Sequence, residues 1–336
     1  MSQETKHDQT NCLVVSKTAD VVTRKIETRP LSADVGDTIR ISVEYSSLNY
    51  KDALCASGHP GIARKLPIVP GIDAAGTIVS DPTGQYQVGD AVMVFHASFG
   101  TESDGGYSEF IDVPQHWVYP IPAGLTPRNC MVIGTAGFTA AQCIDELMKH
   151  NVVPDSGDIV VTGATGGVGI CAVKLLAKLG YRVVAVTGKQ DRAAWLRELG
   201  AAEVLSREDV NDTTGKPLLP GRWAGAVDTV GGNTLATILR STKPQGCVTA
   251  CGLVGGVDFD ISVFPFILRG VTLQGVDTAG ISREYRAGIW DKLASNWAFA
   301  GLDDLAIEVG LNDLEEKIEA ILAGQIAGRV IVKVNV

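Results

Sequence analysis

The residues best suited to do chemistry lie in a glycine-rich stretch at positions 158–180, DIVVTGATGGVGICAVKLLAKLG. Ala164, Gly166 and Gly169 have the spacing of a GxGxxG motif with alanine first, and Gly163 and Gly167 add backbone freedom. Glycines in such a turn let the main chain approach a pyrophosphate, whose charge the N-terminus of a following helix favours. The stretch therefore predicts a dinucleotide site. The alternative is a turn selected only for tight packing of a strand against a helix.

The elements around this turn agree with a nucleotide-binding fold. An apolar run at 159–161 predicts a strand before the glycines, and apolar periodicity over 170–179 predicts a helix that ends at Gly180. Further buried strands are predicted at 181–186, 224–230, 247–253 and 271–276, with helices at 192–199 and 234–239. Such alternation is typical of a parallel, doubly wound sheet, which binds its cofactor at the carboxyl ends of the strands.

The end of the second predicted strand indicates which nicotinamide cofactor fits. An acidic residue there would bind the ribose hydroxyls of NAD, but this chain has Thr187, Gly188, Lys189 and then Arg192. A hydroxyl with two cations can hold a 2′-phosphate by charge-assisted hydrogen bonds, so we predict NADPH. Asp191 in the same loop is the main observation against this prediction. The alternative for Lys189 and Arg192 is ordinary surface charge at the start of a helix.

Composition limits the class of protein. A chain of 336 residues with 45% hydrophobic content is expected to form two domains. The formal net charge of −9 argues against a nucleic-acid or anionic-membrane partner. The seven cysteines are scattered without a CxxC pair, which favours free thiols in a reducing compartment. No apolar stretch is long enough to span a membrane and the first ten residues lack a signal-peptide core, so we predict a soluble, cytoplasmic protein.

The regions on either side of the nucleotide-binding segment have a different character. Short strands separated by Gly, Pro and Asp turns are predicted at 12–16, 38–45, 76–80 and 91–95, which is typical of a barrel-like β domain. Near the C-terminus, Leu314, Ile318, Ile321 and Leu322 share one helical face, and residues 329–334 read as a strand. We expect that strand to rejoin the N-terminal domain.

Several stretches carry a family resemblance: SSLNYKDAL at 46–54, PGIDAAGTI at 70–78, QVGDAV at 87–92, GGYSEF at 105–110, IGTAGFTAA at 133–141 and AGRVIVKV at 327–334. With the GATGGVG turn, they make the chain resemble the medium-chain dehydrogenase/reductase superfamily over nearly its full length. The resemblance implies an α/β fold in which a Rossmann domain, a doubly wound parallel sheet, is joined to a GroES-like β-barrel catalytic domain. It implies a catalytic domain at 1–130 plus 280–336 and a cofactor-binding domain at 131–279.

Within that superfamily, zinc alcohol dehydrogenases use a Cys in the segment corresponding to 48–52 and a Gly-His-Glu corresponding to 71–73. This chain has Asn49 in the first segment and Gly71, Ile72 and Asp73 in the second. Catalytic zinc needs three protein ligands, so we predict no metal. The five histidines also lack ligand spacing: His7, His59, His96, His116 and His150. The resemblance is to the zinc-free quinone oxidoreductase and enoyl reductase branch.

Inside this branch, SLNYKDAL, VTGKQDR and the GRVIVKV ending are similar to the acrylyl-CoA reductase subgroup. That similarity implies an NADPH-dependent oxidoreductase that reduces a carbon-carbon double bond conjugated to a thioester carbonyl, converting acrylyl-CoA to propionyl-CoA. Reduction of a quinone or another enone is the nearest alternative, because the hydride chemistry is the same. A non-enzymatic NADPH-binding structural or sensor protein is the alternative from a different class.

Without a metal, the acceptor carbonyl must be polarised by hydrogen bonds. The predicted catalytic residues are Asn49, aligned with the family's active-site loop, Tyr50, as a donor or proton source, and Arg329, on the C-terminal return segment. The alternatives are that Asn49 bonds its own loop, Tyr50 is merely half-buried and Arg329 forms a rim salt bridge. Asp52 is expected to hold the loop by local hydrogen bonds rather than act as a base.

The predicted cofactor contacts come from five segments, of which 134–136 resembles the family's nicotinamide-contacting turn. They are Gly134, Thr135, Gly163, Thr165, Gly166, Gly167, Val168, Gly169, Thr187, Gly188, Lys189, Arg192, Cys251, Gly252, Leu253 and Arg329. Arg64 and Lys65 are the nearest candidates for the phosphates of CoA, although a solvated loop is the better interpretation. The family resemblance suggests a homodimer, and the apolar run at 261–268 is predicted to be an edge strand or a subunit contact.

Overall fold

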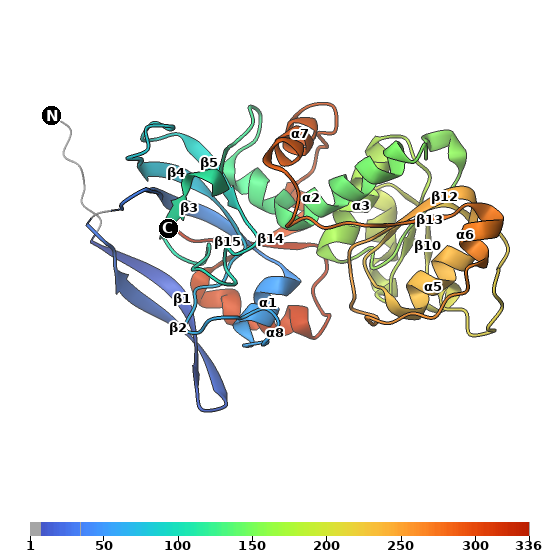
Figure 1. Cartoon of the computed structure of the whole chain (residues 1–336), viewed down its shortest axis with the longest axis horizontal. Coiled ribbons are helices and arrows are strands. Elements are labelled where there is room, and N and C mark those ends of the chain that lie inside the picture. The colour runs from blue at the N-terminus through green and yellow to red at the C-terminus, as the bar shows by residue number, and fades with distance from the viewer. Residues whose placement is uncertain (1–7, 34, 336) are drawn as a thin grey trace. The chain divides into compact units, whose positions relative to one another are not determined.

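The computed structural model describes residues 8–33 and 35–335, and the chain divides into two compact units (Figure 1). Unit 1 comprises residues 1–135 and 301–336, and unit 2 comprises residues 136–300. His7 lies outside the described residues. Within the part of the chain that is described, no helix is long and apolar enough to cross a membrane.

Unit 2 is built on a six-stranded sheet with the order β10-β9-β8-β11-β12-β13, in which every neighbouring pair is parallel. The strands are β8 (Ile159–Val161), β9 (Val183–Val186), β10 (Ala201–Leu205), β11 (Trp223–Asp228), β12 (Thr242–Ala250) and β13 (Thr272–Gly275). The helices are α3 (Gly167–Lys178), α4 (Ala193–Glu198), α5 (Gly232–Arg240), α6 (Phe264–Arg269) and α7 (Arg283–Ala294). Strand order reverses between β8 and β11, and this switch point is where a doubly wound sheet opens a crevice for a ligand.

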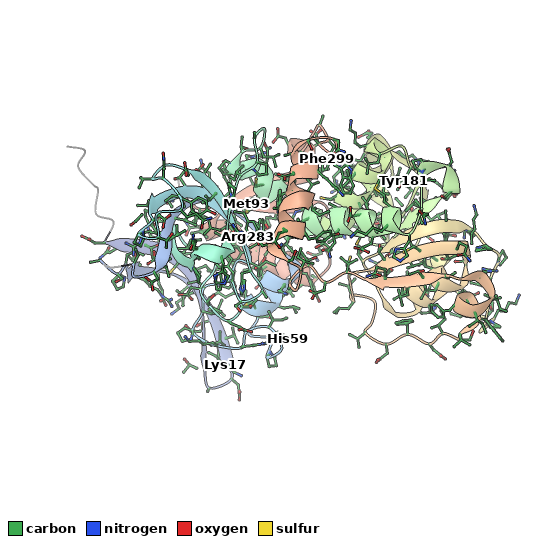
Figure 2. The ribbon with its side chains drawn as sticks, turned by 45° about the horizontal axis from the view of Figure 1, so that its top comes forward. Lys17, His59, Met93, Tyr181, Arg283 and Phe299 are labelled. Atoms are coloured by element: carbon green, nitrogen blue, oxygen red, sulfur yellow. The ribbon has the colours of Figure 1, made fainter. Side chains whose placement is uncertain are left out.

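The buried strands explain why unit 2 folds this way. All residues of β8, β9 and β11 are buried, as expected for central strands of a parallel sheet covered on both faces. Tyr181, at the entry to β9 (Figure 2), is also buried, and its hydroxyl donates a hydrogen bond to the carbonyl of Val152 at 2.8 Å. The predicted Rossmann architecture is confirmed.

The apolar run at 261–268 does not form the edge strand that was one of its two predicted forms. Residues 264–268 of this run belong to α6, in which Pro265 occupies the first turn, where its missing N–H costs nothing. Apolar composition alone cannot separate a short helix from a strand.

Unit 1 contains a seven-stranded sheet in which β14-β15-β3-β4-β5-β7 are neighbours and β6 pairs with β3. Its strands are β3 (Thr38–Leu48), β4 (Asp73–Ser80), β5 (Ala91–Phe95), β6 (Phe110–Pro114), β7 (Val118–Pro120), β14 (Ala306–Gly310) and β15 (Arg329–Lys333). A separate hairpin is formed by β1 (Gln9–Thr18) and β2 (Val21–Pro30), with Lys17 near its tip (Figure 2). Helices α1 (Tyr50–Ala56) and α8 (Leu314–Leu322) contact each other (Figure 1).

Strand β15 joins the two ends of the chain within unit 1. It pairs antiparallel with β3, so that Val330 lies opposite Leu48, and parallel with β14. The predicted return of the C-terminal strand to the N-terminal domain is confirmed. Because of this pairing, Arg329 at the start of β15 lies beside the segment that follows β3.

The units meet in sequence at 135/136 and 300/301, later than the predicted 130/131 and 279/280. Helix α2 (Pro127–Lys149) is interrupted at Gly134, whose φ of 51° and ψ of −163° are not helical. Helix α7 belongs to unit 2 because it packs on the second half of α2. Asp145 of α2 accepts hydrogen bonds from Lys292 at 2.5 Å and from Tyr285 at 2.8 Å.

Candidate active site

Asp52 organises the start of α1 in unit 1. Its Oδ2 accepts a hydrogen bond from the backbone N–H of Asn49 at 2.8 Å, and its Oδ1 accepts one from the N–H of Ile72, also at 2.8 Å. The side chain is fully buried. Burial, and secondly the charge of Asp73, raise the pKa of Asp52 to about 7, although the hydrogen bonds from Asn49 and Ile72 lower it. Asp52 thus holds two loops together, as the sequence predicts.

Asp73, the first residue of β4, is the centre of a buried polar cluster that sequence reasoning did not identify. Its Oδ2 accepts hydrogen bonds from Ser47 Oγ at 2.5 Å, Asn49 Nδ2 at 2.9 Å and the Thr135 N–H at 2.9 Å. Its Oδ1 accepts from Thr135 Oγ1 at 2.5 Å. The available signal was a single acid at the head of an otherwise apolar strand, DAAGTIV. A fully buried carboxylate is retained only where donors satisfy it, as they do here.

Arg329 is 2% exposed and reaches the same cluster from β15. Its Nε donates to the carbonyl of Val132 at 3.0 Å, Nη1 donates to Asn49 Oδ1 at 3.2 Å, and Nη2 lies 3.5 Å from the carbonyl of Met131. Within the described residues, no carboxylate oxygen comes within 4.0 Å of it, so the rim salt bridge does not form. A guanidinium has five N–H groups, and two of them remain for an acceptor that these contacts do not supply.

Asn49 has a fixed orientation. Its Nδ2 donates to Asp73 and also lies 3.1 Å from both Asp52 Oδ2 and Ser47 Oγ, while its Oδ1 accepts from Arg329. Because both amide hydrogens face acceptors of the cluster, Asn49 is better suited to accept a hydrogen bond at Oδ1 than to donate one to a ligand.

The backbone of Gly134 packs directly against this cluster, and there is no room for a side chain. A Cβ at this position would lie 2.7 Å from Arg329 Nη2, 2.8 Å from Asp73 Oδ2 and 3.0 Å from Ser47 Oγ. Its φ of 51° also falls in the left-handed region. The predicted contacts Gly134 and Thr135 are therefore parts of the cluster around Asp73.

The two tyrosines of this region differ. Tyr50, a predicted catalytic residue, is the first residue of α1 and is 38% exposed. Tyr107 is fully buried, and its hydroxyl donates to the carbonyl of Ser47 at 3.1 Å. Burial, together with the charges of Asp52 and Asp73, raises the pKa of Tyr107 well above its ordinary value. Tyr107 therefore supports the backbone at Ser47, a role that the sequence did not predict. Of these two tyrosines, Tyr50 is the one whose side chain solvent reaches.

In unit 2 the glycine-rich turn connects β8 to α3 as predicted. Gly163 has a φ of 59°, and a Cβ on Gly169 would lie 2.3 Å from the carbonyl oxygen of Gly163. Gly166 caps the N-terminus of α3, so the backbone N–H groups of Gly167, Val168 and Gly169 have no earlier helical turn to bond. Oriented N–H groups at a helix N-terminus favour a phosphate, and the turn fits the pyrophosphate of a dinucleotide.

The ends of β8 and β9 are joined by two hydroxyls. Thr165 Oγ1 and Thr187 Oγ1 lie 3.0 Å apart, and Thr187 Oγ1 also accepts the N–H of Lys189 at 3.0 Å. Arg192, in the short helix Gln190–Arg192, forms an exposed ion pair with Asp191 at 3.4 Å. A cation that sequence reasoning missed, Arg207, lies against Gly188 from the segment after β10.

The end of β12 borders a cavity of about 510 Å³. Its lining combines the three predicted cofactor contacts of this segment with residues at the end of β13, namely Ala250, Cys251, Gly252, Leu253, Gly275, Val276 and Asp277. Gly252 is needed here, because a Cβ would lie 2.0 Å from the carbonyl oxygen of Thr229. The cavity lies at the carboxyl ends of the strands, where a doubly wound sheet binds its ligand.

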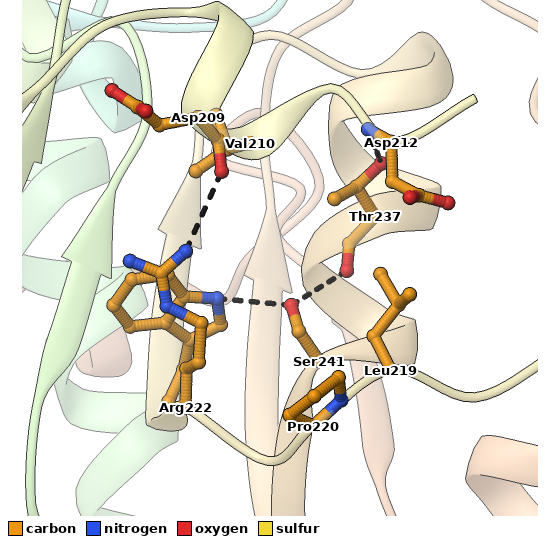
Figure 3. A pocket seen from close by; sticks show the side chains of 9 residues that line it. Asp209, Val210, Asp212, Leu219, Pro220, Arg222, Thr237 and Ser241 are labelled. Carbon is orange, nitrogen blue, oxygen red and sulfur yellow. Dashed lines mark hydrogen bonds between the residues drawn. The ribbon is translucent and has the colours of Figure 1, made fainter. Parts of the chain in front are cut away.

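A second cavity, of about 280 Å³, lies beside Trp223 (Figure 3). The Trp223 Nε1 donates to Ser241 Oγ at 3.0 Å, and the Arg222 guanidinium lies 4.3 Å from the centre of the indole ring. The polar side chains of this cavity bond one another, the nearby backbone, or neighbouring side chains such as Ser206 and Arg240, and none of the predicted site residues lines it.

The donor set does not fit catalytic zinc. Asp73 stands where the resemblance places the Glu of the Gly-His-Glu of zinc alcohol dehydrogenases, but its carboxylate oxygens accept hydrogen bonds from Ser47, Asn49 and Thr135. Among the described residues, no three His, Cys, Asp or Glu side chains are grouped as a metal site requires. Arg64, a candidate for CoA phosphates, instead pairs with Glu102 at 2.6 Å, and Lys65 is exposed.

Comparisons with known proteins agree with this architecture. Residues 36–123 match the alcohol dehydrogenase GroES-like domain, and residues 167–295 match a family described as zinc-binding dehydrogenase. The acrylyl-CoA reductase AcuI of Ruegeria pomeroyi is 40% identical over 97% of this chain and 99% of its own length. The quinone oxidoreductase-like YhfP of Bacillus subtilis is 42% identical over 96% of this chain and 98% of its own.

Two solved structures have the same fold. That of YhdH of E. coli K-12, with bound NADPH, is 41% identical, has a TM-score of 0.92 and covers 96% of this chain and 100% of its own. The structure of YhfP with bound NAD has a TM-score of 0.93 and covers 97% of this chain and 99% of its own. The fold, the turn and these relatives define an oxidoreductase. The chain belongs to the medium-chain dehydrogenase/reductase family, in which it is similar both to acrylyl-CoA reductases and to a quinone oxidoreductase-like protein.

Proposed function

We propose that the protein uses NADPH to reduce the carbon-carbon double bond of acrylyl-CoA, giving propionyl-CoA. The observation that carries this proposal is the buried guanidinium of Arg329, which keeps two N–H groups available and is held by a hydrogen-bonded cluster without a metal. The identity to AcuI over nearly the whole length supports the choice of an enoyl thioester. Unit 1 is proposed to bind the acceptor and unit 2 the cofactor.

When bound, NADPH would supply the hydride that is added to the β-carbon of the acceptor. Negative charge then develops on the carbonyl oxygen, and a donor fixed in advance stabilises that charge at little reorganisation cost. Arg329 is the proposed donor, because Val132 and Asn49 fix its guanidinium plane. Tyr50, which solvent reaches, is the proposed source of the proton that completes the α-carbon. Asn49 is proposed to position Arg329 and to accept a hydrogen bond from ribose.

The cofactor is proposed to bind to the turn after β8 and to the ends of β9 and β12. The N-terminus of α3 would hold the pyrophosphate, and the cavity beside Cys251, Gly252 and Leu253 would border the nicotinamide. NADPH is proposed over NADH because the end of β9 carries cations and no acid at the strand tip. The structure of YhdH holds NADPH, whereas that of YhfP holds NAD, so local chemistry must decide the choice.

The nearest alternative is a reductase of quinones or simple enones, which the similarity to YhfP favours. The experiment that separates the two follows NADPH oxidation with acrylyl-CoA, a free enone and a simple quinone in parallel. A preference for the thioester in kcat/KM is expected. Faster turnover of the quinone would contradict the proposed substrate, and no turnover of any acceptor would favour a non-enzymatic NADPH-binding protein.

We also propose a homodimer formed through α6 and the edge of β13. Strand β13 ends the sheet, and four large apolar side chains on or next to α6 are 41–67% exposed: Val263, Phe264, Ile267 and Leu268. A dimeric mass in ultracentrifugation is expected, and Ile267→Asp should convert it to a monomer. A wild-type monomer at micromolar concentration would contradict the dimer. The seven free cysteines, six of them buried, support the proposed cytoplasmic location.

A further inference from the structure

Arg207 occupies the end of β9 although it comes from a different segment. It follows β10 (Ala201–Leu205), which pairs with β9, and its guanidinium lies over the backbone of Gly188. A Cβ on Gly188 would lie 2.5 Å from Arg207 Nε, 2.6 Å from Cζ and 3.0 Å from Nη2. Any side chain at position 188 would therefore displace the guanidinium, so the glycine makes room for Arg207.

Three cations lie at this point with Asp191 near them. Burial, and secondly the positive charge of Arg207, lower the pKa of Lys189; the charge of Asp191 raises it, and that of Arg192 lowers it. Asp191 lies nearby, but it pairs with Arg192. Positive groups that repel one another at the carboxyl edge of a parallel sheet indicate a site for a negatively charged ligand group.

Three acids follow Arg207 closely in the sequence, and each is bonded mainly by other groups. The pKa of Glu208 is lowered by hydrogen bonds from the backbone and from Ser206, and in last place by the charge of Arg207. Asp209, seen in Figure 3, accepts hydrogen bonds at Oδ2 from the backbone N–H of Ser206 at 2.8 Å and from Ser206 Oγ at 2.9 Å. Asp212 pairs with Arg240 at 3.0 Å. Over the described ranges, no ion pair within 4.0 Å involves Arg207, whose side chain is exposed.

Thr187 is less suited to this role than the sequence predicts. Its side chain is 2% exposed, and its Oγ1 already bonds Thr165 and the N–H of Lys189. It fixes the loop on which Lys189 and Gly188 lie. The groups left to bind an anion are the Lys189 ammonium and the Arg207 guanidinium, whose planar fork matches a phosphate.

We propose that Arg207, rather than Arg192, is the arginine that selects NADPH, and that its guanidinium on Gly188 binds the 2′-phosphate together with Lys189. This inference rests on the proposed NADPH dependence but not on the identity of the acceptor. Arg192 is paired with Asp191, whereas Arg207 forms no ion pair within 4.0 Å among the described residues, so its guanidinium can bind a phosphate.

The test measures dissociation constants by calorimetry for NADPH, NADH and adenosine 2′,5′-bisphosphate, with Arg207→Ala, Arg192→Ala and Gly188→Ala. Arg197→Ala is the matched control, since Arg197 is an exposed arginine of α4 without a described partner. Losing a charge-assisted hydrogen bond should weaken binding of NADPH and the bisphosphate in Arg207→Ala by roughly ten- to one-hundredfold. NADH should bind as in the wild type.

Gly188→Ala should reproduce this selective loss without any change of charge, because its Cβ displaces the guanidinium. Equal losses for NADPH and NADH in Arg207→Ala, or a larger selective loss in Arg192→Ala, would overturn the inference. So would a wild-type protein that binds both cofactors equally. Intact discrimination of the cofactors with no reduction of acrylyl-CoA would contradict the proposed function alone.

Discussion

Arg329 and Asp73 lie beneath the same glycine without forming an ion pair. Each would be within 2.8 Å of a Cβ on Gly134, yet their charged atoms are not within 4.0 Å of each other. Asn49 connects them, donating from Nδ2 to Asp73 and accepting at Oδ1 from Arg329. The carboxylate therefore orients the guanidinium through a neutral amide, which leaves the positive charge of Arg329 for an acceptor.

Arg329→Lys should lower kcat more than it raises KM. A lysine keeps the charge but cannot bond Val132 and Asn49 at once in a fixed plane. Loss of a preorganised donor to a developing oxyanion typically costs about 10²–10³ in kcat. Steady-state kinetics with the best acceptor would measure the effect. A rise in KM with kcat unchanged would mean that Arg329 binds substrate and transition state equally.

Asp73→Ala should destabilise unit 1 strongly, because the donors of Ser47, Asn49 and Thr135 lose their acceptor. Each buried group left unsatisfied costs about 1–3 kcal/mol. Asp73→Asn should cost less, since its amide oxygen can replace Oδ2 while the Thr135 hydroxyl rotates to accept. Urea unfolding would measure the free energy of unfolding of both Asp73 variants. Asp155→Ala serves as the control, because Asp155 is exposed. Equal stability of all three variants would show that the cluster does not support the fold.

Gly134→Ala should impair both folding stability and activity, because its Cβ would meet Arg329 and Asp73. Gly84→Ala separates this collision from backbone strain, since Gly84 also has a positive φ, of 73°, but no atom within 4 Å of the added Cβ. We expect a cost on the order of 1 kcal/mol from strain at Gly84 and a larger one at Gly134. Similar losses in thermal unfolding at both positions would contradict the role given to Gly134.

The stability of the protein should depend on the ionisation of Asp52. Because its pKa is raised to about 7 in the folded state, the folded chain holds a proton that the unfolded chain releases near pH 4. The contribution of the protonated Asp52 to the free energy of unfolding is therefore fully present below about pH 4 and is lost as the pH rises to about 7. The loss should amount to a few kcal/mol. Asp52→Asn cannot ionise and should remove the dependence.

The measurement is the free energy of unfolding of the wild type and of Asp52→Asn at a pH of about 5 and of about 8. The gap between the two proteins should shift in favour of the variant at the higher pH. Parallel behaviour of the two proteins would show that Asp52 is ionised throughout.

Local signals in the sequence predicted the fold well. The turn at 163–169 and its flanking elements are contiguous, so periodicity and glycine spacing were sufficient to place β8 and α3. The division at 300/301 was missed because α7 joins unit 2 through Asp145, a contact between positions far apart in the sequence. The helix α6 was missed because a short apolar run suits either structure.

The candidate site was predicted only in part, because its members meet through long-range contacts. Asn49 and Arg329 are 280 positions apart, and only the family resemblance pointed to Arg329. Asp73 gave little signal, because an acid at the start of a strand usually faces solvent. Arg207 gave none, since its proximity to Gly188 depends on the pairing of β9 with β10.

The most direct test of the account is product analysis with NADPH carrying deuterium in its transferable position, incubated with acrylyl-CoA in ordinary water. Mass spectrometry should find propionyl-CoA with a single deuterium on the β-carbon and a solvent proton on the α-carbon. Oxidation of the cofactor without labelled propionyl-CoA, or no oxidation of the cofactor by acrylyl-CoA, would contradict the proposed reduction of an enoyl thioester.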